Sequence, residues 1–296
     1  MFSIITPTYN RKHLIHRVYE SLMQQSFKDF TWIVVDDGST DGTKTLIETW
    51  ANTTYDFKIE YYLLPKNVGK PEAVNFGLTK CNQEYTIIAD SDDTFVSNTL
   101  SDLKEMWEKA NLKSNNIAAI WTLVTDENDT IKGDKFPEDW WQVNFKTRVL
   151  EQKEQLQGDK WHCWKTDILK KHPLYSAEKC HIGESHTWNR INKKYDFVCV
   201  NIAHLKAHVT NDSLITSKKA RKTEARAAYY SAYYCLKDVA VKDIASYKYY
   251  RSLAFEYAKS KMFYSDDKLK LSVSKYIASL VIFLIQIPKR ALKKLL

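Results

Sequence analysis

Glycine and proline are scarce in this sequence, with seven and six residues among 296. Such a composition excludes a collagen-like chain and argues against a disordered or loop-rich one. Neither G-x-G-x-x-G nor G-x-x-x-x-G-K-[ST] occurs, so neither a dinucleotide site nor a P-loop is indicated. The five cysteines lie far apart and form no C-x-x-C pair. This spacing excludes a zinc pattern and a disulfide framework, and it predicts a reducing compartment.

A signal peptide is also missing, because the N-terminus has neither a basic-then-apolar order nor a small-residue cleavage site. We therefore expect a cytoplasmic protein. Charge is unevenly distributed: the net charge of +8 divides into +12 for residues 217–296 and −4 for the rest. A basic tail favours an anionic partner surface, either lipid headgroups or nucleic acid.

The C-terminal apolar segment Tyr276–Ile287 is 12 residues long. As a helix it would measure about 18 Å, which is short of the roughly 30 Å hydrocarbon core of a bilayer. Pro288 is expected to end this helix, and four cations follow it, namely Lys289, Arg290, Lys293 and Lys294. The pattern predicts a helix that lies in a membrane interface with basic anchors. Packing of this helix on the domain or in a dimer is the alternative.

Strand-like and helix-like segments alternate along the first 124 residues, which predicts βαβ units and a mostly parallel sheet. The expected strands are Phe2–Thr6, Thr31–Val35, Lys58–Leu64, Tyr85–Ala89 and Ile117–Val124. The expected helices are Arg11–Gln25, Thr43–Trp50, Glu72–Lys80 and Leu100–Ala110. In such sheets ligands bind beyond the carboxyl ends of the strands, where polar clusters follow the first, second and fourth of these segments.

Residues 130–215 have weak periodicity, and only His162–Leu169 and Phe197–Leu205 are predicted as strands. From Ser217 onward the chain is predicted to form helices rich in tyrosine and lysine.

The stretch Ile87–Phe95, IIADSDDTF, ends a buried-looking strand with three carboxylates in four residues: Asp90, Asp92 and Asp93. Like charges this close raise one another's pKa, so a cation is expected nearby. A helix N-cap explains one or two of these acids. Three are better explained by Mg²⁺ or Mn²⁺, which prefer hard oxygen ligands and could clamp a diphosphate.

Two further clusters are each ambiguous by themselves. Val34–Gly42, VVDDGSTDG, could hydrogen-bond a base or ribose through its acids, or form an ordinary turn into a helix. Thr6–Asn10, TPTYN, places a tyrosine ring after the first strand, where it could stack on a base or simply belong to a turn.

Four blocks follow one another in the first 124 residues: TPTYNR, VVDDGSTDGT, NVGKPEAVNFGL and ADSDD. In this order and spacing they resemble the inverting glycosyltransferases of family 2, of the bacterial surface-polysaccharide type. The resemblance is strong over Met1–Val124 and continues more weakly to Leu214 through GDKWHCWKTDILKK and IGESHTWNRI. It implies the GT-A fold, a Rossmann-like α/β architecture.

The resemblance also implies roles for individual residues. The D-x-D motif maps onto Asp90-Ser91-Asp92, where Asp92 would contact Mn²⁺ or Mg²⁺ and act in catalysis through it. Asp90 would contact the ribose or the sugar and is a second candidate metal ligand. The expected donor is a nucleotide sugar, UDP-linked as is usual in the family. Its nucleotide would be bound by Thr6, Pro7, Tyr9, Asn10, Asp36, Asp37, Asn67, Gly69, Lys70, Asp90 and Ser91.

An inverting transfer needs a base that takes the proton of the acceptor hydroxyl. Family members carry an acidic pair where this chain reads IGESHTW, and here Glu184 matches the first acid while Ser185 replaces the second. We identify Glu184 as the base, with Asp139 and His186 as fallbacks. A role for Glu184 in orienting the acceptor hydroxyl is the alternative.

His204 and His208 have a spacing that could share a metal on a helix, but the neighbouring residues look strand-like, which favours structural roles. Some GT-A enzymes use a histidine here as an extra metal ligand, so His208 stays a candidate ligand.

Aromatic and basic clusters in the second half have ordinary explanations. Of five tryptophans we expect one to stack on an acceptor sugar and the rest to be core: Trp140, Trp141, Trp161, Trp164 and Trp188. The run Lys218–Lys222 lacks a nucleic-acid module around it, so no nucleic-acid partner is expected.

The sequence therefore predicts a GT-A catalytic domain over residues 1–216, with a nucleotide-sugar half (1–124) and an acceptor half (125–216). A basic helical extension (217–296) would associate with the membrane. We predict a metal-dependent enzyme on the inner face of the cell membrane, which moves a sugar to a hydroxyl of a glycan acceptor that the basic tail suggests is lipid-linked. A catalytically silent GT-A module that binds glycan or scaffolds an assembly is the alternative, since Ser185 departs from the pattern. A nucleotidyltransferase would need a glycine-rich loop where this chain reads PTYNRK.

Overall fold

A computed structural model describes residues 1–53, 56–152, 156–177, 180, 182–208 and 221–292. Residues 218–220 of the run Lys218–Lys222 lie outside these ranges, and so do the predicted anchors Lys293 and Lys294. The chain forms two compact units. The first comprises residues 1–148, 152–174 and 187–213, and the second comprises 149–151, 175–186 and 214–296. The second unit therefore includes a short segment, 175–186, that the sequence analysis assigns to the acceptor half of the catalytic domain.

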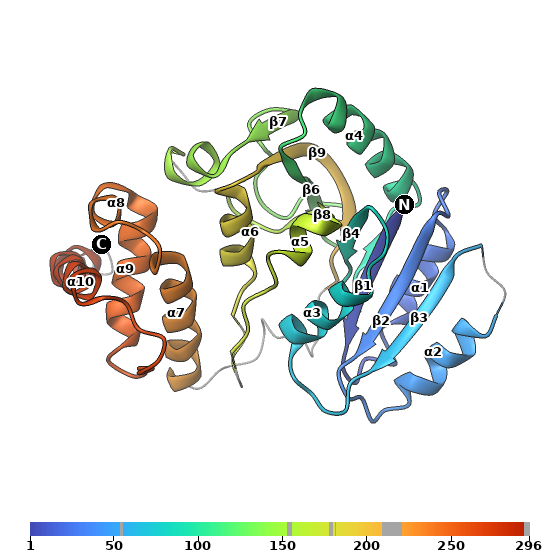
Figure 1. Cartoon of the computed structure of the whole chain (residues 1–296), viewed down its shortest axis with the longest axis horizontal. Helices are drawn as coiled ribbons and strands as arrows, with labels where there is room; N and C mark the ends of the chain where they lie inside the picture. Colours follow the sequence, from blue (N-terminus) through green and yellow to red (C-terminus); the bar gives the residue numbers. More distant parts are fainter. Residues whose placement is uncertain (54–55, 153–155, 178–179, 181, 209–220, 293–296) are drawn as a thin grey trace. The chain divides into compact units, whose positions relative to one another are not determined.

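A nine-stranded sheet forms the centre of the first unit (Figure 1). Its strands are β1 (Phe2–Thr8), β2 (Phe30–Asp36), β3 (Lys58–Leu63), β4 (Tyr85–Ile88), β5 (Thr94–Phe95), β6 (Ile117–Thr125), β7 (Trp140–Val143), β8 (Lys160–Lys165) and β9 (Asp196–Lys206). The helices are α1 (His16–Met23), α2 (Thr43–Ala51), α3 (Lys70–Lys80), α4 (Thr99–Lys113), α5 (Thr166–Lys170) and α6 (Ser185–Asn192), with a π-helical turn at Lys146–Leu150.

The strand order is β3-β2-β1-β4-β8-β6-β9-β5, with β7 paired to β9. The three longest pairings, β1 with β2, β2 with β3 and β6 with β9, are parallel, as is β1 with β4. The pairings of β8 with β4 and β6, and of β9 with β5 and β7, are antiparallel. The sheet is thus mixed: the expected parallel arrangement holds for β1 to β4 and for β6 with β9, whereas β8, β5 and β7 pair with their neighbours in the antiparallel direction.

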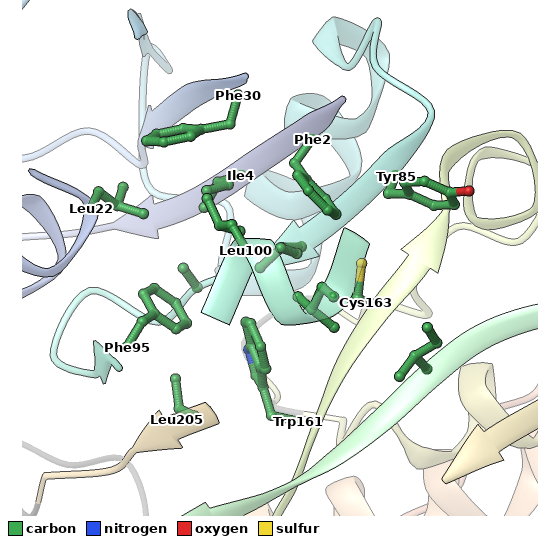
Figure 2. Packing of buried hydrophobic residues seen from close by; sticks show 14 of the residues in the cluster. Phe2, Ile4, Leu22, Phe30, Tyr85, Phe95, Leu100, Trp161, Cys163 and Leu205 are labelled. Carbon is green, nitrogen blue, oxygen red and sulfur yellow. The ribbon is translucent and has the colours of Figure 1, made fainter. Parts of the chain in front are cut away.

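Alternating side chains of the strands bury both faces of the sheet. On one face, Phe2, Ile4 and Trp32 pack with apolar residues of α1, α2 and α4. Figure 2 shows part of this cluster around Phe2, Ile4 and Leu100. On the other face, Ile5 and Ile33 pack with residues of α3, α5 and α6. A sheet covered by helices on both faces keeps its functional surface at the ends of its strands.

One predicted strand is only half correct. The segment His162–Leu169 begins in β8, but α5 starts at Thr166, so its second half is helical. The change occurs where the Thr166 N–H bonds to the Glu84 carbonyl and its hydroxyl lies 2.9 Å from that of Thr86. Side-chain and backbone bonds of this kind let a threonine leave the ladder of a strand.

The second unit contains α7 (Arg221–Leu236), α8 (Val241–Ser246), α9 (Lys248–Ser260) and α10 (Val273–Leu292), which agrees with the helices predicted from Ser217 onward. Tyrosines fill its interior: the rings of Tyr229 and Tyr257 stack with centroids 4.9 Å apart. Their neighbour Tyr230 donates a 2.7 Å hydrogen bond to Asp266. Buried tyrosines combine a large apolar area with a hydroxyl that needs a partner, and this unit supplies both.

Helix α10 continues past Pro288 to Leu292, so the prediction that Pro288 ends the helix is wrong. A proline inside a helix removes one backbone hydrogen bond, and the lysine, arginine, alanine and leucine that follow are good helix formers. Among the described residues, no helix is both long enough and apolar enough to cross a membrane.

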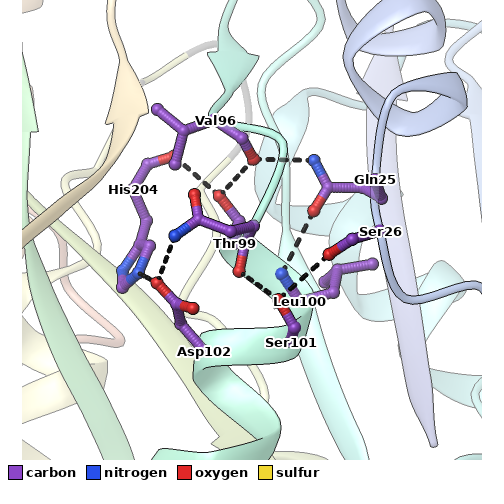
Figure 3. Close-up of polar contacts among 9 residues, drawn as sticks. Gln25, Ser26, Val96, Thr99, Leu100, Ser101, Asp102 and His204 are labelled. Carbon is purple, nitrogen blue, oxygen red and sulfur yellow. Dashed lines mark hydrogen bonds and ion pairs between the residues drawn. The ribbon is translucent and has the colours of Figure 1, made fainter.

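A buried side chain, Gln25, ties α1 to the segment that follows β4 (Figure 3). Its amide nitrogen donates to the Val96 carbonyl at 2.8 Å, and its oxygen accepts the Leu100 N–H at 3.1 Å. In the same network the Thr99 hydroxyl donates to the carbonyls of Val96 and His204. The network therefore joins α1, β9 and the start of α4 just beyond the acidic turn at the end of β4.

We expect Gln25→Met to lower the free energy of unfolding by about 2 kcal/mol, because the Leu100 N–H loses its partner and the Val96 carbonyl loses one of its donors. Urea unfolding followed by circular dichroism measures this. Gln24→Met is the matched control, since Gln24 is the exposed neighbour in the sequence. Equal stability of the two variants would show that the Gln25 network contributes nothing.

Candidate active site

The strands β1 to β4 are parallel to one another, so their carboxyl ends lie at the same edge of the sheet. The turns that follow these strands therefore meet at that edge. All the residues predicted to bind a nucleotide lie at this edge. They are Thr6 and Pro7 at the end of β1, Tyr9 and Asn10 just after it, Asp36 and Asp37 at the end of β2, Asn67, Gly69 and Lys70 after β3, and Asp90 and Ser91 after β4. Asp92 lies on the same turn as Asp90.

Two cations lie against the acidic turn. The Lys70 ammonium, at the start of α3, contacts both carboxylate oxygens of Asp90 at 2.7 and 2.9 Å. The Arg11 guanidinium, from the turn after β1, lies 3.2 Å from the Asp92 carboxylate. Burial and the charge of Asp90 raise the pKa of Asp92, while Arg11 and Lys70 act in the opposite direction. The positive charge expected from the sequence is thus supplied in part by the protein itself.

The third acid of the turn, Asp93, has the most unfavourable surroundings. Burial raises its pKa to about 8, and the charges of Asp90 and Asp92 act in the same direction. Lys70 and the backbone N–H of His208 oppose this shift only in part. A neutral Asp93 at neutral pH relieves the repulsion among three neighbouring carboxyl groups.

The acids at the end of β2 organise backbone. Asp36 has no exposed surface, accepts the Ser39 N–H at 2.8 Å and accepts the Tyr61 hydroxyl at 2.8 Å. Asp37 accepts the N–H groups of Val68 and Gly69 at 2.7 and 2.8 Å, so it joins the second turn to the third. A nucleotide contact by Asp36 would therefore require this turn to move.

The turn after β1 offers the more accessible groups. The Tyr9 side chain is 45% exposed, so its ring is available for stacking. Asn10 adopts a left-handed conformation (φ 52°), its N–H donates to the Ser39 hydroxyl and its side-chain oxygen accepts the Thr40 N–H. These bonds fasten the first turn to the second. Thr6 is buried and accepts a hydrogen bond from the Trp32 indole, so it shapes the wall from behind.

A divalent cation fits the acidic turn only as part of a complex with a ligand. In the described part of the chain no group of three His, Cys, Asp or Glu side chains is arranged to hold a metal. Asp90 and Asp92 supply two carboxylates, and Mg²⁺ in nucleotide sites commonly takes one or two carboxylates, with phosphate and water oxygens completing its shell. His208 lies beside this turn, but its ring nitrogens contact Thr94 at 3.0 Å and Glu127 at 3.3 Å.

The candidate bases lie in different surroundings. Glu184 is half-buried, precedes α6 and belongs to the second unit. His186 is buried within that unit, where its Nδ1 lies 3.3 Å from the Ser231 hydroxyl. Asp139 is exposed in the first unit and accepts a 3.1 Å hydrogen bond from Asn201. Of the three candidate bases, Glu184 and Asp139 are therefore the two that solvent reaches.

The remaining aromatic and histidine candidates are mainly structural. His204 is fully buried and bonds to Asp102 at 3.2 Å, as Figure 3 shows. Four of the five tryptophans are buried, and Trp164 stacks on Trp188 with ring centroids 4.3 Å apart. Trp140 is half-buried beneath the Lys109 ammonium, 4.0 Å from the ring centroid.

The model for glycosyl transferase family 2 matches residues 3–166, which is more than half of the chain. The chain belongs to glycosyl transferase family 2. The resemblance stated from the four sequence blocks is thereby confirmed.

Curated relatives with similar sequences are named as glycosyltransferases of bacteria. The GalNAc(5)-diNAcBac-PP-undecaprenol beta-1,3-glucosyltransferase of Campylobacter jejuni is 35% identical over 104 residues, which cover 35% of this chain and 33% of that protein. The poly(ribitol-phosphate) beta-N-acetylglucosaminyltransferase TarS of Staphylococcus aureus is 36% identical over 104 residues, which cover 34% of this chain and 18% of that protein. The match thus spans a third or less of either relative.

Solved structures confirm the predicted fold class. TarS residues 1–349 of Staphylococcus aureus, in complex with UDP-GlcNAc, align with a TM-score of 0.60 and 20% identity over 98% of this chain and 82% of that chain. The mannosyltransferase PcManGT of Pyrobaculum calidifontis, in complex with GDP-Man and Mn²⁺, aligns with a TM-score of 0.51 and 18% identity over 97% of this chain and 87% of that chain. At these identities the likeness concerns the fold alone.

Sequence reasoning missed two arginines of this family 2 site. Arg11 contacts the Asp92 carboxylate, and the Arg17 guanidinium donates to the Asp92 carbonyl at 3.4 Å. Both belong to the basic, polar part of the predicted helical segment Arg11–Gln25, where such residues are usually solvated. Only the pairing of β1 with β4 brings them to the acidic turn.

The high pKa of Asp93 makes stability depend on pH. A carboxyl whose pKa rises from 3.8 in the unfolded chain to about 8 in the folded one binds its proton more tightly when folded. Its contribution to stability is therefore present at low pH and is lost as pH rises from about 4 to about 8.

We expect Asp93→Asn to be more stable than the unmodified protein at pH 8, with the difference shrinking toward pH 5. Urea unfolding across this range measures it. The exposed acid Asp29, changed to Asn, serves as the control, and a constant difference between Asp93→Asn and the unmodified protein at all pH values would contradict the prediction.

Proposed function

We propose that this family 2 chain transfers a sugar from a nucleotide donor, UDP-linked, to a hydroxyl of a glycan acceptor with inversion at the anomeric carbon. The observation that carries the proposal is the meeting of four turns at one sheet edge, with Asp90 and Asp92 faced by Lys70 and Arg11. Acids paired with cations at a strand edge suit a ligand that brings both phosphate and metal.

The donor side rests on accessible groups of the first unit. Exposed Tyr9 would stack on the base, and exposed Asn67 would line the pocket beside it. Lys70 would exchange part of its contact with Asp90 for a phosphate oxygen. Asp36 and Asp37 would hold the second and third turns in shape behind the nucleotide. The complex of TarS with UDP-GlcNAc supports the choice of a UDP-linked donor.

Asp92, with Asp90, would hold Mn²⁺ or Mg²⁺. When bound, such an ion supplies positive charge to the departing diphosphate. Asp92 is the better placed of the two, because the Arg11 guanidinium contacts one of its carboxylate oxygens at 3.2 Å, whereas Lys70 contacts both oxygens of Asp90 at 2.7 and 2.9 Å. His208 remains a weaker candidate ligand, since binding a metal would require its ring to leave Thr94 or Glu127.

Glu184 would take the proton of the acceptor hydroxyl as that oxygen attacks the anomeric carbon. A carboxylate next to the first turn of α6 is accessible and close to backbone N–H groups that stabilise its charge. Asp139 is the accessible fallback. His186 is the weakest of the three, because it is buried within the second unit.

We further propose a lipid-linked acceptor and attachment of the enzyme to the inner face of the cell membrane. The undecaprenol-linked substrate in the name of the Campylobacter jejuni relative supports the acceptor class. Helix α10 supports the attachment, because one of its faces is apolar and exposed. The exposed residues of this face include Val273, Ile277, Val281, Leu284 and Ile285.

Transfer is tested by incubating the protein with UDP-sugars and Mn²⁺, with and without polyprenyl-linked saccharides, and measuring the release of UDP. Release that requires one donor sugar, followed by a product of inverted configuration, supports the proposal. A silent GT-A module would bind UDP and release none from any donor, even with acceptor present. Release of pyrophosphate from a nucleoside triphosphate would instead indicate a nucleotidyltransferase.

Two substitutions separate donor binding from proton transfer. We expect Asp92→Asn to abolish turnover and to weaken metal-dependent UDP binding, since a metal ligand is lost. Glu184→Gln is expected to bind UDP normally and to lower kcat by about 10²–10⁴-fold, because a base acts in the transition state. Calorimetric titration with UDP and steady-state kinetics measure both.

Asp139→Asn is the control for Glu184→Gln. If Asp139→Asn loses kcat while Glu184→Gln keeps it, Asp139 is the base and the assignment to Glu184 is wrong.

For the membrane, we expect that deleting Tyr276–Leu296, or changing Val281, Leu284 and Ile285 together to serine, abolishes flotation with vesicles that contain anionic lipid. The apolar face would otherwise enter the interface. Leu112→Ser is the matched control, because Leu112 is 89% exposed on α4 of the first unit. Unchanged flotation of the triple variant would refute attachment through α10.

A further inference from the structure

Asp92 is the proposed metal ligand, and it already has a cationic partner. Arg11 Nη1 lies 3.2 Å from Asp92 Oδ2, and the two side chains are 17% and 22% exposed. A guanidinium cannot lose its proton in a protein, so this partner is always charged. At this depth solvent screens the pair only in part. A divalent cation that approaches Asp92 therefore meets a fixed positive charge on the same carboxylate.

We propose that Arg11 competes with the divalent cation for Asp92, and that its transfer from Asp92 to the diphosphate couples metal binding to nucleotide binding. The inference rests on the proposed function, since it assumes a metal–diphosphate at this turn. It goes beyond that function by giving Arg11 a role as a positioning residue, because of which the metal binds tightly only together with the nucleotide.

The coupling follows from charge. Without the diphosphate, a metal ion at Asp92 either shares the carboxylate with Arg11 or displaces it, and both cost binding free energy. With the diphosphate, Arg11 gains an anion whose oxygens suit the planar, forked donors of a guanidinium. Arg11, once displaced from Asp92, is then paired with the diphosphate, so the cost in metal-binding free energy is removed. By linkage, the metal raises the affinity for nucleotide by the same factor.

The neighbouring cations are placed differently, which makes the assignment specific to Arg11. Arg17 donates to the backbone carbonyl of Asp92 at 3.4 Å and leaves the carboxylate oxygens to other partners. Lys70 is bound to Asp90. The charges that act on the carboxyl group of Asp92 from nearby cations are those of Arg11 and Lys70.

The test is a titration of Mn²⁺ against the full chain, followed by the electron paramagnetic resonance signal of free Mn²⁺, with and without UDP. We expect Arg11→Gln to bind Mn²⁺ alone about fivefold to tenfold more tightly than the unmodified protein, as for the loss of one partly exposed charge pair. The enhancement of Mn²⁺ affinity by UDP is expected to shrink by a similar factor. Arg17→Gln, which removes the same charge from α1, six residues along the chain, is expected to change neither value.

An Arg11→Gln variant that binds Mn²⁺ alone no better than the unmodified protein overturns the inference, and so does an equal gain in Arg17→Gln. Thermal unfolding checks that each variant is folded, and Arg11→Lys, which keeps the charge, is expected to bind Mn²⁺ like the unmodified protein. If no form binds Mn²⁺ even with UDP, the proposed function fails with it. If UDP enhances Mn²⁺ binding equally in all forms, only the role of Arg11 fails.

Discussion

The structure of this site depends on one electrostatic constraint: a buried strand, β4, ends in three carboxyl groups within four residues. Such a turn is tolerated because Lys70 pairs with Asp90, Arg11 pairs with Asp92 and burial favours the neutral form of Asp93. Each compensation comes from a different part of the chain. The parallel sheet brings them together, because β1 lies between β2 and β4 and delivers its following turn to the same edge. The fold is thus what makes the acidic turn possible.

A second set of hydrogen bonds joins the neighbouring turns at the same edge of the sheet. Asp37 joins the second turn to the third through the N–H groups of Val68 and Gly69. Gly38 makes the joint possible, since it has a φ of +83° and a Cβ there would lie 3.0 Å from the backbone nitrogen of Asn67. Hydrogen bonds of this kind hold the second and third turns in one arrangement, and a site preorganised in this way loses less entropy when a ligand binds.

Most strands and helices of the first 124 residues were predictable because apolar periodicity and local turn chemistry specify them, although β5 was not predicted and α1 begins at His16 rather than at Arg11. The position of Arg11 was not, because it depends on the pairing of β1 with β4, which no local pattern encodes. The burial of Asp36 was hidden for a similar reason: its partner Tyr61 lies 25 positions along the chain. The reversed direction of β8 and the continuation of α10 through Pro288 are decided by packing and by neighbouring residues, against the local signal.

The residues proposed to bind the donor and the residue proposed as the base differ in how strongly the sequence indicates them. The family model matches residues 3–166, a stretch that holds every predicted nucleotide residue and Asp92, but not Glu184. Sequence likeness to TarS covers 34% of the chain, whereas likeness in fold covers 98%. A nucleotide diphosphate presents the same atoms to every enzyme that uses it, so its site tolerates few residue types. An acceptor hydroxyl demands only a base within reach of its proton. The residues proposed to bind the donor were therefore more open to inference from sequence than Glu184, the proposed base.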